Sequence, residues 1–314
     1  MLKPKGDAIV TLGELLVEVM RPEVGVPLDT PGTFRGPFAS GAPAIFAWAA
    51  ASLGGRVRFA GVVGNDPFGA LCKRHLDQAG VELHIRTTPD SETGIAFVNY
   101  LGTGGRDFLF HLRHSAAAGL LPSDVTPELL ENVGWLHVTG SSLSVSEGMR
   151  QAVFAAVEGA KAAGAVVSFD PNLRPELLRE IGLDELCGPV LAAADVVLPS
   201  GAEAEVLTGL NGPDEACRRL LERAEVVLLK RGAAGCTVFT GEEGQPFSSL
   251  SVQEVDPTGA GDCFAAGFAV ATLNGLDLPD AVRFASAAGA RSVTAFGPTS
   301  AALSYEEVLG FLRT

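Results

Sequence analysis

The stretch VDPTGAGDCFAAGF, residues 255–268, places two glycines and an acidic residue where a helix is predicted to begin. Glycine inside a helix lowers the stability of that helix by about 1 kcal/mol relative to alanine, so the presence of Gly259 and Gly261 requires an explanation. Thr258 is the predicted N-cap, and Gly261 stands where a capping box would have glutamate. The first-turn amides are therefore free of side-chain partners, and with the positive end of the helix dipole they form an anion site.

Asp262 follows this turn directly and points to a reaction at the bound anion. A carboxylate there would compete with a phosphate unless it has its own task, and one such task is to accept the proton of a hydroxyl that attacks the phosphate. The structural alternative is a pair of glycines that lets the helix pack closely against a sheet. The stretch is neither a GxxxxGK[ST] phosphate loop nor a GxGxxG dinucleotide fingerprint, because Phe264 stands where the last glycine belongs.

The elements that must position these residues alternate between strands and helices from about residue 134 onward. Strands are predicted at 135–140, 165–170, 195–200 and 225–232, and helices at 146–164, 185–194, 201–209 and 214–224. Further strands are predicted at 8–12, 15–20, 56–64 and 251–255, and further helices at 42–55, 66–80 and 259–273. This order predicts an α/β fold with a central, mostly parallel sheet flanked by helices, in which ligands bind at the carboxyl ends of the strands.

Two segments lie outside this alternation and predict a second, smaller β layer. Residues from about 14 to 38 are rich in glycine and proline and lack helical periodicity, and residues 93–112 form a predicted hairpin around the turn GTGG. We expect these two segments to form a small β-sheet lid over a cleft. No linker or internal repeat interrupts the chain, so residues 1–314 are predicted to form one domain.

The composition of the chain argues against several classes of binding partner and of structural site. The chain has 314 residues and a formal net charge of −14, which argues against nucleic acid or an anionic membrane as the main partner. Five scattered cysteines without a CxxC spacing predict reduced thiols in a cytoplasmic protein rather than a disulfide framework or a zinc site. No uninterrupted apolar run approaches about 18 residues, so no membrane span is expected.

The stretch DPTGAGDCFAAGF resembles the C-terminal signature of the PfkB, or ribokinase-like, family of carbohydrate kinases. The resemblance covers nearly the whole chain, because SGAPAIFAWAAASLGGRVRFAGVVGNDPFG is similar to the N-terminal signature of that family. FDPNLRPEL, residues 169–177, resembles a segment of its fructokinase and 2-keto-3-deoxygluconate kinase members. The resemblance implies a single ribokinase-like kinase domain with a small β-sheet lid.

The family uses the aspartate of GAGD as its catalytic base, which implies that role for Asp262. The amides of Gly259, Ala260 and Gly261 would then form the anion hole for the transferring phosphoryl group. Phosphoryl transfer depends mainly on positioning and charge neutralisation, so Asp262 is expected to orient the sugar hydroxyl and to take its proton late.

The resemblance also implies sites for ATP and its ions. In LPSGAEAEVLTG, Glu203 matches the glutamate of the family's Asn-x-x-Glu motif, which organises Mg²⁺, and Ser200 stands in place of the asparagine. Asp256 and Thr258 are similar to positions that help to form a monovalent-cation site, which implies K⁺. Without the resemblance, Glu203 would read as a solvated acid in the first turn of a helix, and Asp256 as a turn residue.

The nucleotide itself is expected at the turn LKRGAAG, which resembles the family's nucleotide-binding turn. Lys230, Gly232 and Gly235 lie there on a predicted strand–turn–strand unit, which on its own would be a simple hairpin. Asn172 is a further candidate for contact with the nucleotide, although it could face either ligand.

For the sugar, the resemblance implies that Gly41 permits close approach of the substrate to the backbone. Glu14 and Arg174 are candidates for polar contacts. An arginine that contacts substrate in relatives could correspond to Arg113, or its place could be taken by His111, because the spacing in FHLRHSAA is one residue shorter than the family's.

One departure from the family bears on the choice of sugar. Ile45 stands where the N-terminal signature usually has an asparagine, so one sugar hydroxyl would need another partner or would be absent. Arg113 and Arg174 could pair with a carboxylate, which favours a keto sugar acid slightly, and a phosphorylated sugar would suit two arginines as well.

The function predicted from the resemblance is ATP- and Mg²⁺-dependent transfer of the γ-phosphate to a hydroxyl of a ketose or keto sugar acid, with fructose and 2-keto-3-deoxygluconate as the leading substrates. A nucleoside or sugar-phosphate kinase is the alternative within the family. A non-catalytic sugar or nucleotide sensor is the alternative outside it, and the intact Asp262 argues against that sensor. Pairing of two lids into a homodimer would cover an exposed strand edge.

Overall fold

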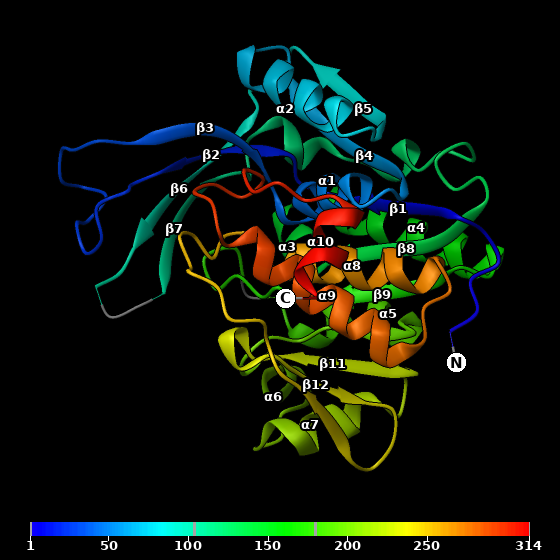
Figure 1. Cartoon of the computed structure of the whole chain (residues 1–314). Helices are drawn as coiled ribbons and strands as arrows, with labels where there is room; N and C mark the ends of the chain where they lie inside the picture. Colours follow the sequence, from blue (N-terminus) through cyan, green and yellow to red (C-terminus); the bar gives the residue numbers. More distant parts are fainter. Residues whose placement is uncertain (1, 103–104, 179–180, 314) are drawn as a thin grey trace.

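Two β-sheets organise the protein in the computed structural model, which describes residues 2–102, 105–178 and 181–313. A large sheet lies at the centre between two layers of helices, and a small sheet extends away from it on one side (Figure 1). This arrangement confirms the predicted α/β class.

The large sheet has nine strands. In spatial order they are β13 (Gly244–Phe247), β12 (Cys236–Phe239), β11 (Val226–Lys230), β10 (Val196–Val197), β9 (Val166–Asp170), β8 (Val133–Thr139), β1 (Ala8–Leu12), β4 (Arg56–Gly64) and β5 (Glu82–Thr88). Neighbours from β11 to β5 are parallel, whereas β12 and β13 continue the sheet antiparallel to β11. All five residues of β11 are buried, as expected for an apolar strand covered on both faces.

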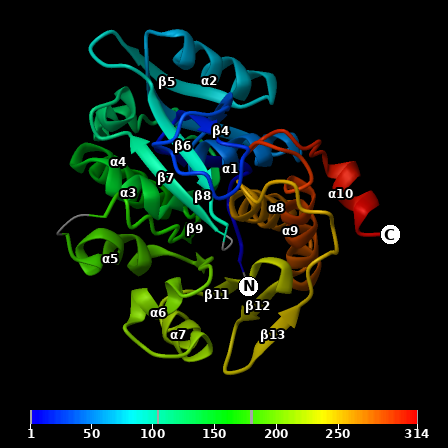
Figure 2. The same cartoon turned by 90° about the vertical axis from the view of Figure 1, so that its left-hand side faces the viewer.

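Helices cover both faces of this sheet (Figure 2). One layer contains α1 (Ala42–Ser52), α2 (Pro67–Gln78), α8 (Ala260–Leu273), α9 (Leu278–Ser292) and α10 (Tyr305–Phe311). The other contains α3 (Gly140–Val145), α4 (Glu147–Ala163), α5 (Leu183–Ala193), α6 (Glu203–Thr208) and α7 (Pro213–Leu220). Three short 3-10 helices are η1 (Ala116–Gly119), η2 (Pro122–Asp124) and η3 (Gly232–Ala234).

Most predicted helices and strands are confirmed, and two of the predicted strands differ from the structure. The predicted strand at 195–200 contains only the two residues Val196–Val197, because the chain turns at Pro199 toward α6. The predicted strand at 251–255 is wrong, since these residues form a loop and Val255 is 50% exposed.

The small sheet has the strand order β3 (Arg35–Ser40), β2 (Leu16–Met20), β6 (Gly94–Tyr100) and β7 (Arg106–His111). Both predicted segments therefore contribute, β2 with β3 and β6 with β7, and the hairpin prediction is confirmed except that residues 103–104 of its turn lie outside the described residues. Burial alternates along β7, with the odd-numbered residues exposed and the even-numbered ones half-buried. One face of the small sheet is thus turned toward the rest of the protein.

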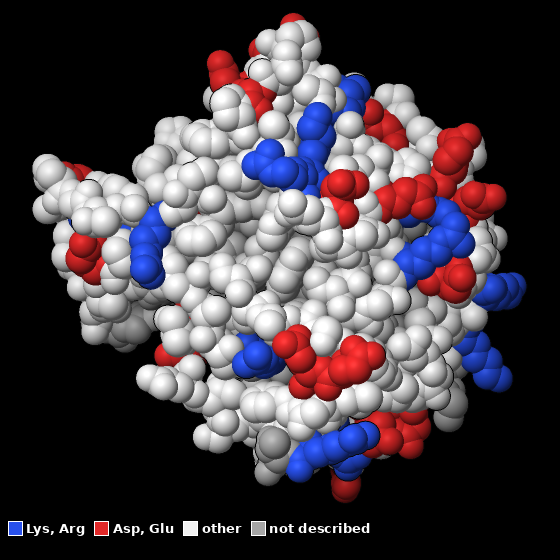
Figure 3. All heavy atoms as spheres, turned by 45° about the horizontal axis from the view of Figure 1, so that its top comes forward, with Lys and Arg blue, Asp and Glu red and all other residues white. Residues whose placement is uncertain are grey.

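The structure also bears on membrane spans, on the state of the cysteines and on the distribution of surface charge. In the described ranges, no helix is long and apolar enough to cross a membrane. All five cysteines are free and buried. On the face that Figure 3 presents, acidic and basic side chains are interspersed.

Candidate active site

Two adjoining cavities open at the carboxyl ends of the parallel strands, where the fold predicts ligand binding. The inner cavity, of about 230 Å³, is lined by residues of both sheets. The outer groove, of about 960 Å³, runs between the turn after β11 and helices α8 and α9. The residues that line both are Arg106, Ser200, Lys230, Pro257, Ala260 and Gly261. A group bound in one cavity can therefore reach a molecule bound in the other.

The N-terminus of α8 lies at the junction of the two cavities. Gly259 is its N-cap in the left-handed conformation, with φ of 81°, and no side chain caps the first turn. The prediction that Thr258 is the N-cap is wrong, because its hydroxyl donates to Asp256 Oδ1 at 2.7 Å and accepts from Arg106 Nη1 at 2.8 Å. No side chain caps the first turn, as the glycines predict, although the Ala260 amide donates to the Pro257 carbonyl oxygen at 3.3 Å. Amides without side-chain caps at a helix N-terminus favour the binding of an anion.

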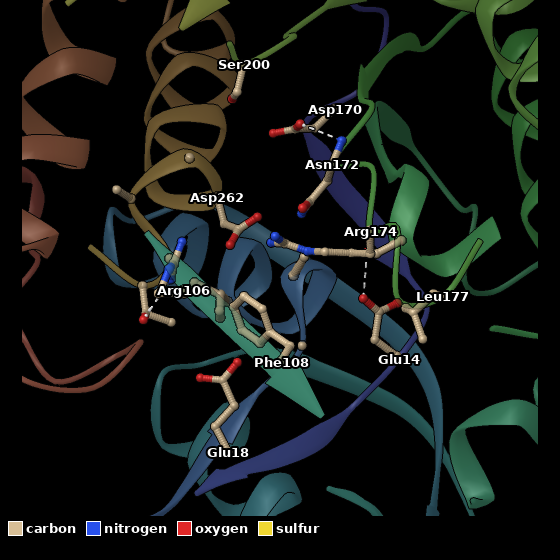
Figure 4. Close-up of a pocket in the computed structure, with 18 of the residues that line it drawn as sticks. Glu14, Glu18, Arg106, Phe108, Asp170, Asn172, Arg174, Leu177, Ser200 and Asp262 are labelled. Atoms are coloured by element: carbon tan, nitrogen blue, oxygen red, sulfur yellow. Dashed lines mark hydrogen bonds between the residues drawn. The ribbon is translucent and has the colours of Figure 1, made fainter. Parts of the chain in front are cut away.

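Asp262 projects from this turn into the inner cavity (Figure 4). Its side chain is 8% exposed and accepts no hydrogen bond from any described residue. Burial, reinforced by the negative charge of Asp170, raises the pKa of Asp262 to about 8, while Lys230 and Arg174 oppose the shift. A buried carboxyl that faces a cavity without a partner, with a pKa near neutrality, suits a general base.

Lys230 and Asp170 form a buried ion pair at the ends of β11 and β9. Glu203 lies beside this pair at the start of α6, where it accepts hydrogen bonds from the backbone amides of Leu173 at 2.8 Å and Ser200 at 2.6 Å. Burial raises the pKa of Glu203, and the charge of Asp170 adds to the effect. These groups link the chain at the ends of β9, β10 and β11, and all three of them line the inner cavity.

The predicted nucleotide turn lines the outer groove. Gly232 and Gly235 have φ of 56° and 92°, and a Cβ on Gly235 would lie 2.0 Å from the carbonyl oxygen of Phe247. Ser200 lines both cavities. Asn172, which the sequence allowed to face either ligand, lies along the inner cavity and is not among the residues of the outer groove.

Three predicted sugar contacts, Glu14, Gly41 and Arg174, line the inner cavity. The Glu14 carboxylate accepts from the hydroxyls of Ser141 at 2.7 Å and Ser142 at 2.5 Å, and burial raises its pKa. Gly41 is required by the backbone itself, because its φ is 109° and a Cβ would lie 2.2 Å from the Glu14 carbonyl oxygen. The close approach at Gly41 is therefore one between two parts of the chain. Arg174 extends across the cavity toward Asp262 (Figure 4).

The other two predicted sugar contacts lie outside the inner cavity. His111 is exposed on β7 and contacts the ring of Phe97 edge-on, on the opposite face of the strand from the cavity. Arg113 follows the strand, and its guanidinium donates to the carbonyl oxygen of Leu177 at 2.9 Å. The structure does not bring His111 or Arg113 to the wall of the inner cavity, because the two-residue period of β7 turns His111 outward and the chain leaves the sheet before Arg113.

Apolar side chains form the remaining wall of the inner cavity. They are Leu16, Phe108, Phe110, Leu112 and Leu177. Ile45 also lines the cavity, is 3% exposed and packs against the N-cap of α8, since a Cβ on Gly259 would lie 3.0 Å from its Cγ2. The inner cavity is thus lined by charged and apolar side chains together, and the Phe108 ring lies next to the guanidinium groups of Arg106 and Arg174.

Comparison with known proteins identifies the family of the chain. Residues 7–304 match the pfkB family of carbohydrate kinases. The chain belongs to this family. A curated fructokinase of Salmonella typhimurium is 34% identical, with 95% of this chain and 96% of the relative covered. As a pfkB carbohydrate kinase, the protein is a phosphotransferase that acts on a sugar hydroxyl, as the sequence predicts.

Solved structures of pfkB kinases agree with this fold. A structure described as ribokinase II from E. coli, in complex with ATP and Mg²⁺, has a TM-score of 0.89 and 36% identity, with 98% of this chain and 99% of that chain covered. A double mutant of the fructokinase from Vibrio cholerae O395, bound to fructose, ADP and a potassium ion, has a TM-score of 0.85 and 30% identity, with 99% of both chains covered. These similarities confirm the ribokinase-like fold.

The donors present fit a magnesium ion that arrives with phosphates better than one held by protein alone. Among the described residues, no group of three His, Cys, Asp or Glu side chains could hold a metal ion. Asp170 is paired with Lys230, and both Glu203 oxygens accept backbone amides. Magnesium usually keeps several waters and takes only one or two carboxylates besides phosphate oxygens, which leaves Glu203 as a candidate to act through water.

Asp256 and Thr258, predicted to help bind a monovalent cation, lie in the loop before α8. Asp256 is fully buried, with Oδ1 accepting from the amide and hydroxyl of Thr258 and Oδ2 accepting from the amide of Gly297 at 2.8 Å. The structure therefore gives Asp256 a structural task, which is to join this loop to the loop that contains Gly297.

Several residues of the inner cavity were not predicted from the sequence, among them Asp170 and Ser141 and residues of the small sheet. Arg106, Phe108 and Glu18 reach the inner cavity from strands β7 and β2 of the small sheet. Glu18 is 6% exposed, and burial raises its pKa to about 7. The alternation in RDFLFH carries the information that could have located Arg106, because a two-residue period places it on the same face as Phe108 and Phe110.

Proposed function

We propose that this pfkB kinase uses ATP to phosphorylate a keto sugar acid of the 2-keto-3-deoxygluconate type, with Asp262 as the base. The observation that carries the proposal is the unpaired, buried Asp262 carboxylate in the inner cavity, between the uncapped amides of α8 and Arg174. In the transfer, the sugar hydroxyl oxygen forms a bond to the γ-phosphorus, and the bond from that phosphorus to the β,γ-bridging oxygen breaks. ADP leaves, and the hydroxyl proton goes to Asp262.

The uncapped first turn of α8 supports a role for Gly259, Ala260 and Gly261 as the anion hole of this transfer. Backbone amides fixed before the reaction stabilise developing charge without reorganisation. The raised pKa of Asp262, about 8, supports proton transfer near neutral pH. Glu14, held by two serine hydroxyls, is proposed to accept a hydrogen bond from another sugar hydroxyl.

The choice of a keto deoxy sugar acid rests on one cationic side chain and two apolar side chains that line the inner cavity. Arg174 offers a guanidinium to a carboxylate, a pairing that is often bidentate. Ile45 and Phe108, which also line the cavity, would leave a sugar hydroxyl that faces them without a hydrogen-bond partner, which costs about 1–3 kcal/mol. A substrate that has a methylene group in place of this hydroxyl loses no hydrogen bond there. Fructose, which carries no carboxylate, is the substrate against which the proposal is tested.

Similarity to the complexes with ATP and Mg²⁺ and with ADP and K⁺ supports the same ligands for this chain. We place the nucleotide in the outer groove at Lys230, Gly232 and Gly235, beside Ser200. Mg²⁺, when bound, would neutralise charge on the phosphate oxygens, with Glu203 ordering its waters. Potassium would bind next to the loop of Asp256 and Thr258.

The small sheet is proposed to act as a lid over the inner cavity and to pair with a second copy through its outer face. Phe34, Phe97 and Leu109 lie on that outer face, where Leu109 is 48% exposed and the two phenylalanine rings meet edge-on at 5.9 Å. Light scattering should give a dimer that Leu109→Glu converts to a monomer, and a monomeric wild type would contradict the pairing. A cytoplasmic location completes the proposal, supported by five free, buried cysteines.

The substrate is tested by measuring ADP release with 2-keto-3-deoxygluconate, fructose, ribose, fructose 6-phosphate and a nucleoside. We expect the keto acid to have the highest kcat/KM. Arg174→Gln should lower kcat/KM for the keto acid by about 10²-fold, equivalent to about 3 kcal/mol, and for fructose by much less, because only the acid loses an ionic partner. Arg283→Gln serves as the matched control, since Arg283 is exposed, pairs with Asp280 and is not among the residues that line either cavity.

Each alternative has its own outcome in this assay. Equal losses for the keto acid and fructose in Arg174→Gln would contradict the carboxylate contact. Highest activity on the nucleoside or on fructose 6-phosphate would replace the keto acid by that substrate class. No turnover with any sugar, while ligands still raise the melting temperature, would support the sensor instead of the enzyme.

A further inference from the structure

Arg106 occupies a position in the site that differs from that of Arg174. Among the described residues of the small sheet, Arg106 is the one that lines both the inner cavity and the outer groove. Arg174 lines the inner cavity and is not among the residues of the outer groove. The guanidinium of Arg106 therefore lies where a group would cross from one cavity to the other.

Two contacts hold the Arg106 guanidinium in this place. Its Nη1 donates to Thr258 Oγ1 at 2.8 Å, directly before the N-cap of α8, and Thr258 is in turn fixed by Asp256. The guanidinium carbon of Arg106 also lies 5.5 Å from the centroid of the Phe108 ring, and that of Arg174 lies 5.1 Å from the same ring. One aromatic ring thus positions both arginines, by interactions that favour a cation near the ring.

The charges around Arg106 favour the arrival of an anion. Arg106 and Arg174 are like charges near one ring, and burial together with this repulsion lowers the pKa of the Arg106 guanidinium, although Glu18 and Asp256 oppose the effect. Its remaining N–H groups have no hydrogen-bond partner among the described residues. A multiply charged phosphoryl group would satisfy these donors and relieve the repulsion between the two arginines.

We infer that Arg106 is a catalytic residue of the small sheet that contacts the transferring phosphoryl group, whereas Arg174 serves the sugar. This inference rests on the proposed function, because it needs a phosphoryl group to pass between the two cavities. The small sheet then completes the anion site of α8 in addition to covering the sugar. Arginines that neutralise charge in phosphoryl transfer accelerate it strongly, and loss of one fixed donor typically lowers kcat by about 10²–10³-fold.

The test uses the full chain and variants Arg106→Gln and Arg106→Lys, with Arg174→Gln as the matched control. The binding probe is ADP with Mg²⁺ and aluminium fluoride, which imitates a planar phosphoryl group, measured by melting temperature without sugar. In the wild type, aluminium fluoride should raise the melting temperature beyond ADP and Mg²⁺ alone. Arg106→Gln should lose this additional shift and keep the ADP shift, Arg106→Lys should keep part of it, and Arg174→Gln should keep all of it.

Steady-state kinetics give the second readout. Arg106→Gln should lower kcat by about 10²-fold with little change in the KM for sugar. An additional aluminium fluoride shift that survives in Arg106→Gln, or is absent from the wild type, would overturn the inference. So would a raised sugar KM with an intact kcat, which would make Arg106 a sugar ligand. If the wild type turns over no sugar but shows the additional shift, the proposed function fails alone, and the shift in Arg106→Gln still decides the role of Arg106.

Discussion

The inner cavity and the outer groove differ in the kinds of residue that line them. Charged side chains dominate the inner cavity, where Glu14, Arg174 and Asp262 come from three separate parts of the chain. The outer groove includes a turn of small residues, Gly232, Ala233, Ala234 and Gly235, which are consecutive in sequence. Backbone geometry at such a turn is set by the local sequence, whereas side chains of the inner cavity can be exchanged without changing the fold. We therefore expect substitutions to affect chemistry and specificity through the inner cavity, and to affect the fold through the outer groove.

The largest effect is expected for Asp262→Asn. Asparagine keeps the shape of the side chain but cannot take the hydroxyl proton, so kcat should fall by about 10²–10⁴-fold. The outer groove is unchanged, so the shift in melting temperature with ADP and Mg²⁺ should remain. If turnover persists near the wild-type rate, another group takes the proton; if ADP binding is lost, the two cavities are not separable in the way that we describe.

The second prediction concerns Lys230, which belongs to both cavities. Lys230 and Asp170 are 8% and 2% exposed, so Lys230→Met would leave Asp170 as a buried charge without a partner. The free energy of unfolding should fall by about 3–5 kcal/mol in denaturant titrations. The control is the double variant Lys230→Met with Asp170→Leu, which removes both charges and should recover most of the loss. A double variant as unstable as the single one would show that the pair is not the cause.

The third prediction compares two glycines of the outer groove. Both have positive φ, but a Cβ on Gly235 would meet the Phe247 carbonyl oxygen, whereas no described atom lies within 4 Å of a Cβ on Gly232. Gly232→Ala should therefore lower the free energy of unfolding by about 1–2 kcal/mol from backbone strain alone. Gly235→Ala should cost clearly more, because the chain must move. Equal losses in the two variants would indicate that backbone strain alone decides the stability of this turn.

The fold and the outer groove could be predicted from the sequence to a greater extent than the inner cavity. The α8 turn with Asp262 and the turn at Gly232 are local features, so a short stretch determines each of them. Arg106 enters the inner cavity only because β7 pairs with β6 and turns alternate residues inward, a relation between distant segments. The choice of His111 or Arg113 relied on sequence spacing alone and ignored this two-residue period.

The N-cap prediction failed for a related reason. Thr258 has the right residue type and position for a cap, and nothing in the local sequence excludes that role. In the structure, Asp256 and Arg106 compete successfully for its hydroxyl, and Arg106 comes from the small sheet, 152 residues away in sequence. Long-range contacts of this kind cannot be read from capping preferences.

The fourth prediction is a pH dependence of stability centred on Asp262. Its pKa is raised to about 8 in the folded protein, above the ordinary value of about 4. Between these values the folded state binds more protons than the unfolded state, so this group makes the free energy of unfolding fall as pH rises from about 4 to 8. Because asparagine does not titrate, Asp262→Asn removes the contribution of this group to the fall in the free energy of unfolding. At pH 8.5 the variant should be more stable than the wild type by over about 1 kcal/mol, and the difference should shrink toward pH 5. A pH-independent difference would contradict the raised pKa.

The smallest effect, and the one that tests specificity most directly, is expected at Ile45. Its side chain lines the inner cavity against the N-cap of α8, so Ile45→Asn places a hydrogen-bonding group beside the sugar at the cost of some packing. The ratio of kcat/KM for fructose to that for the keto deoxy acid should rise by about tenfold, because one hydroxyl of fructose gains a partner that the deoxy substrate cannot use. Ile45→Val is the matched control, since it loses packing without adding polarity and should leave the ratio unchanged. Should asparagine and valine change the ratio alike, packing at α8 rather than a missing hydrogen bond would set the preference, and the argument from the apolar side chains of the inner cavity would no longer favour a deoxy sugar.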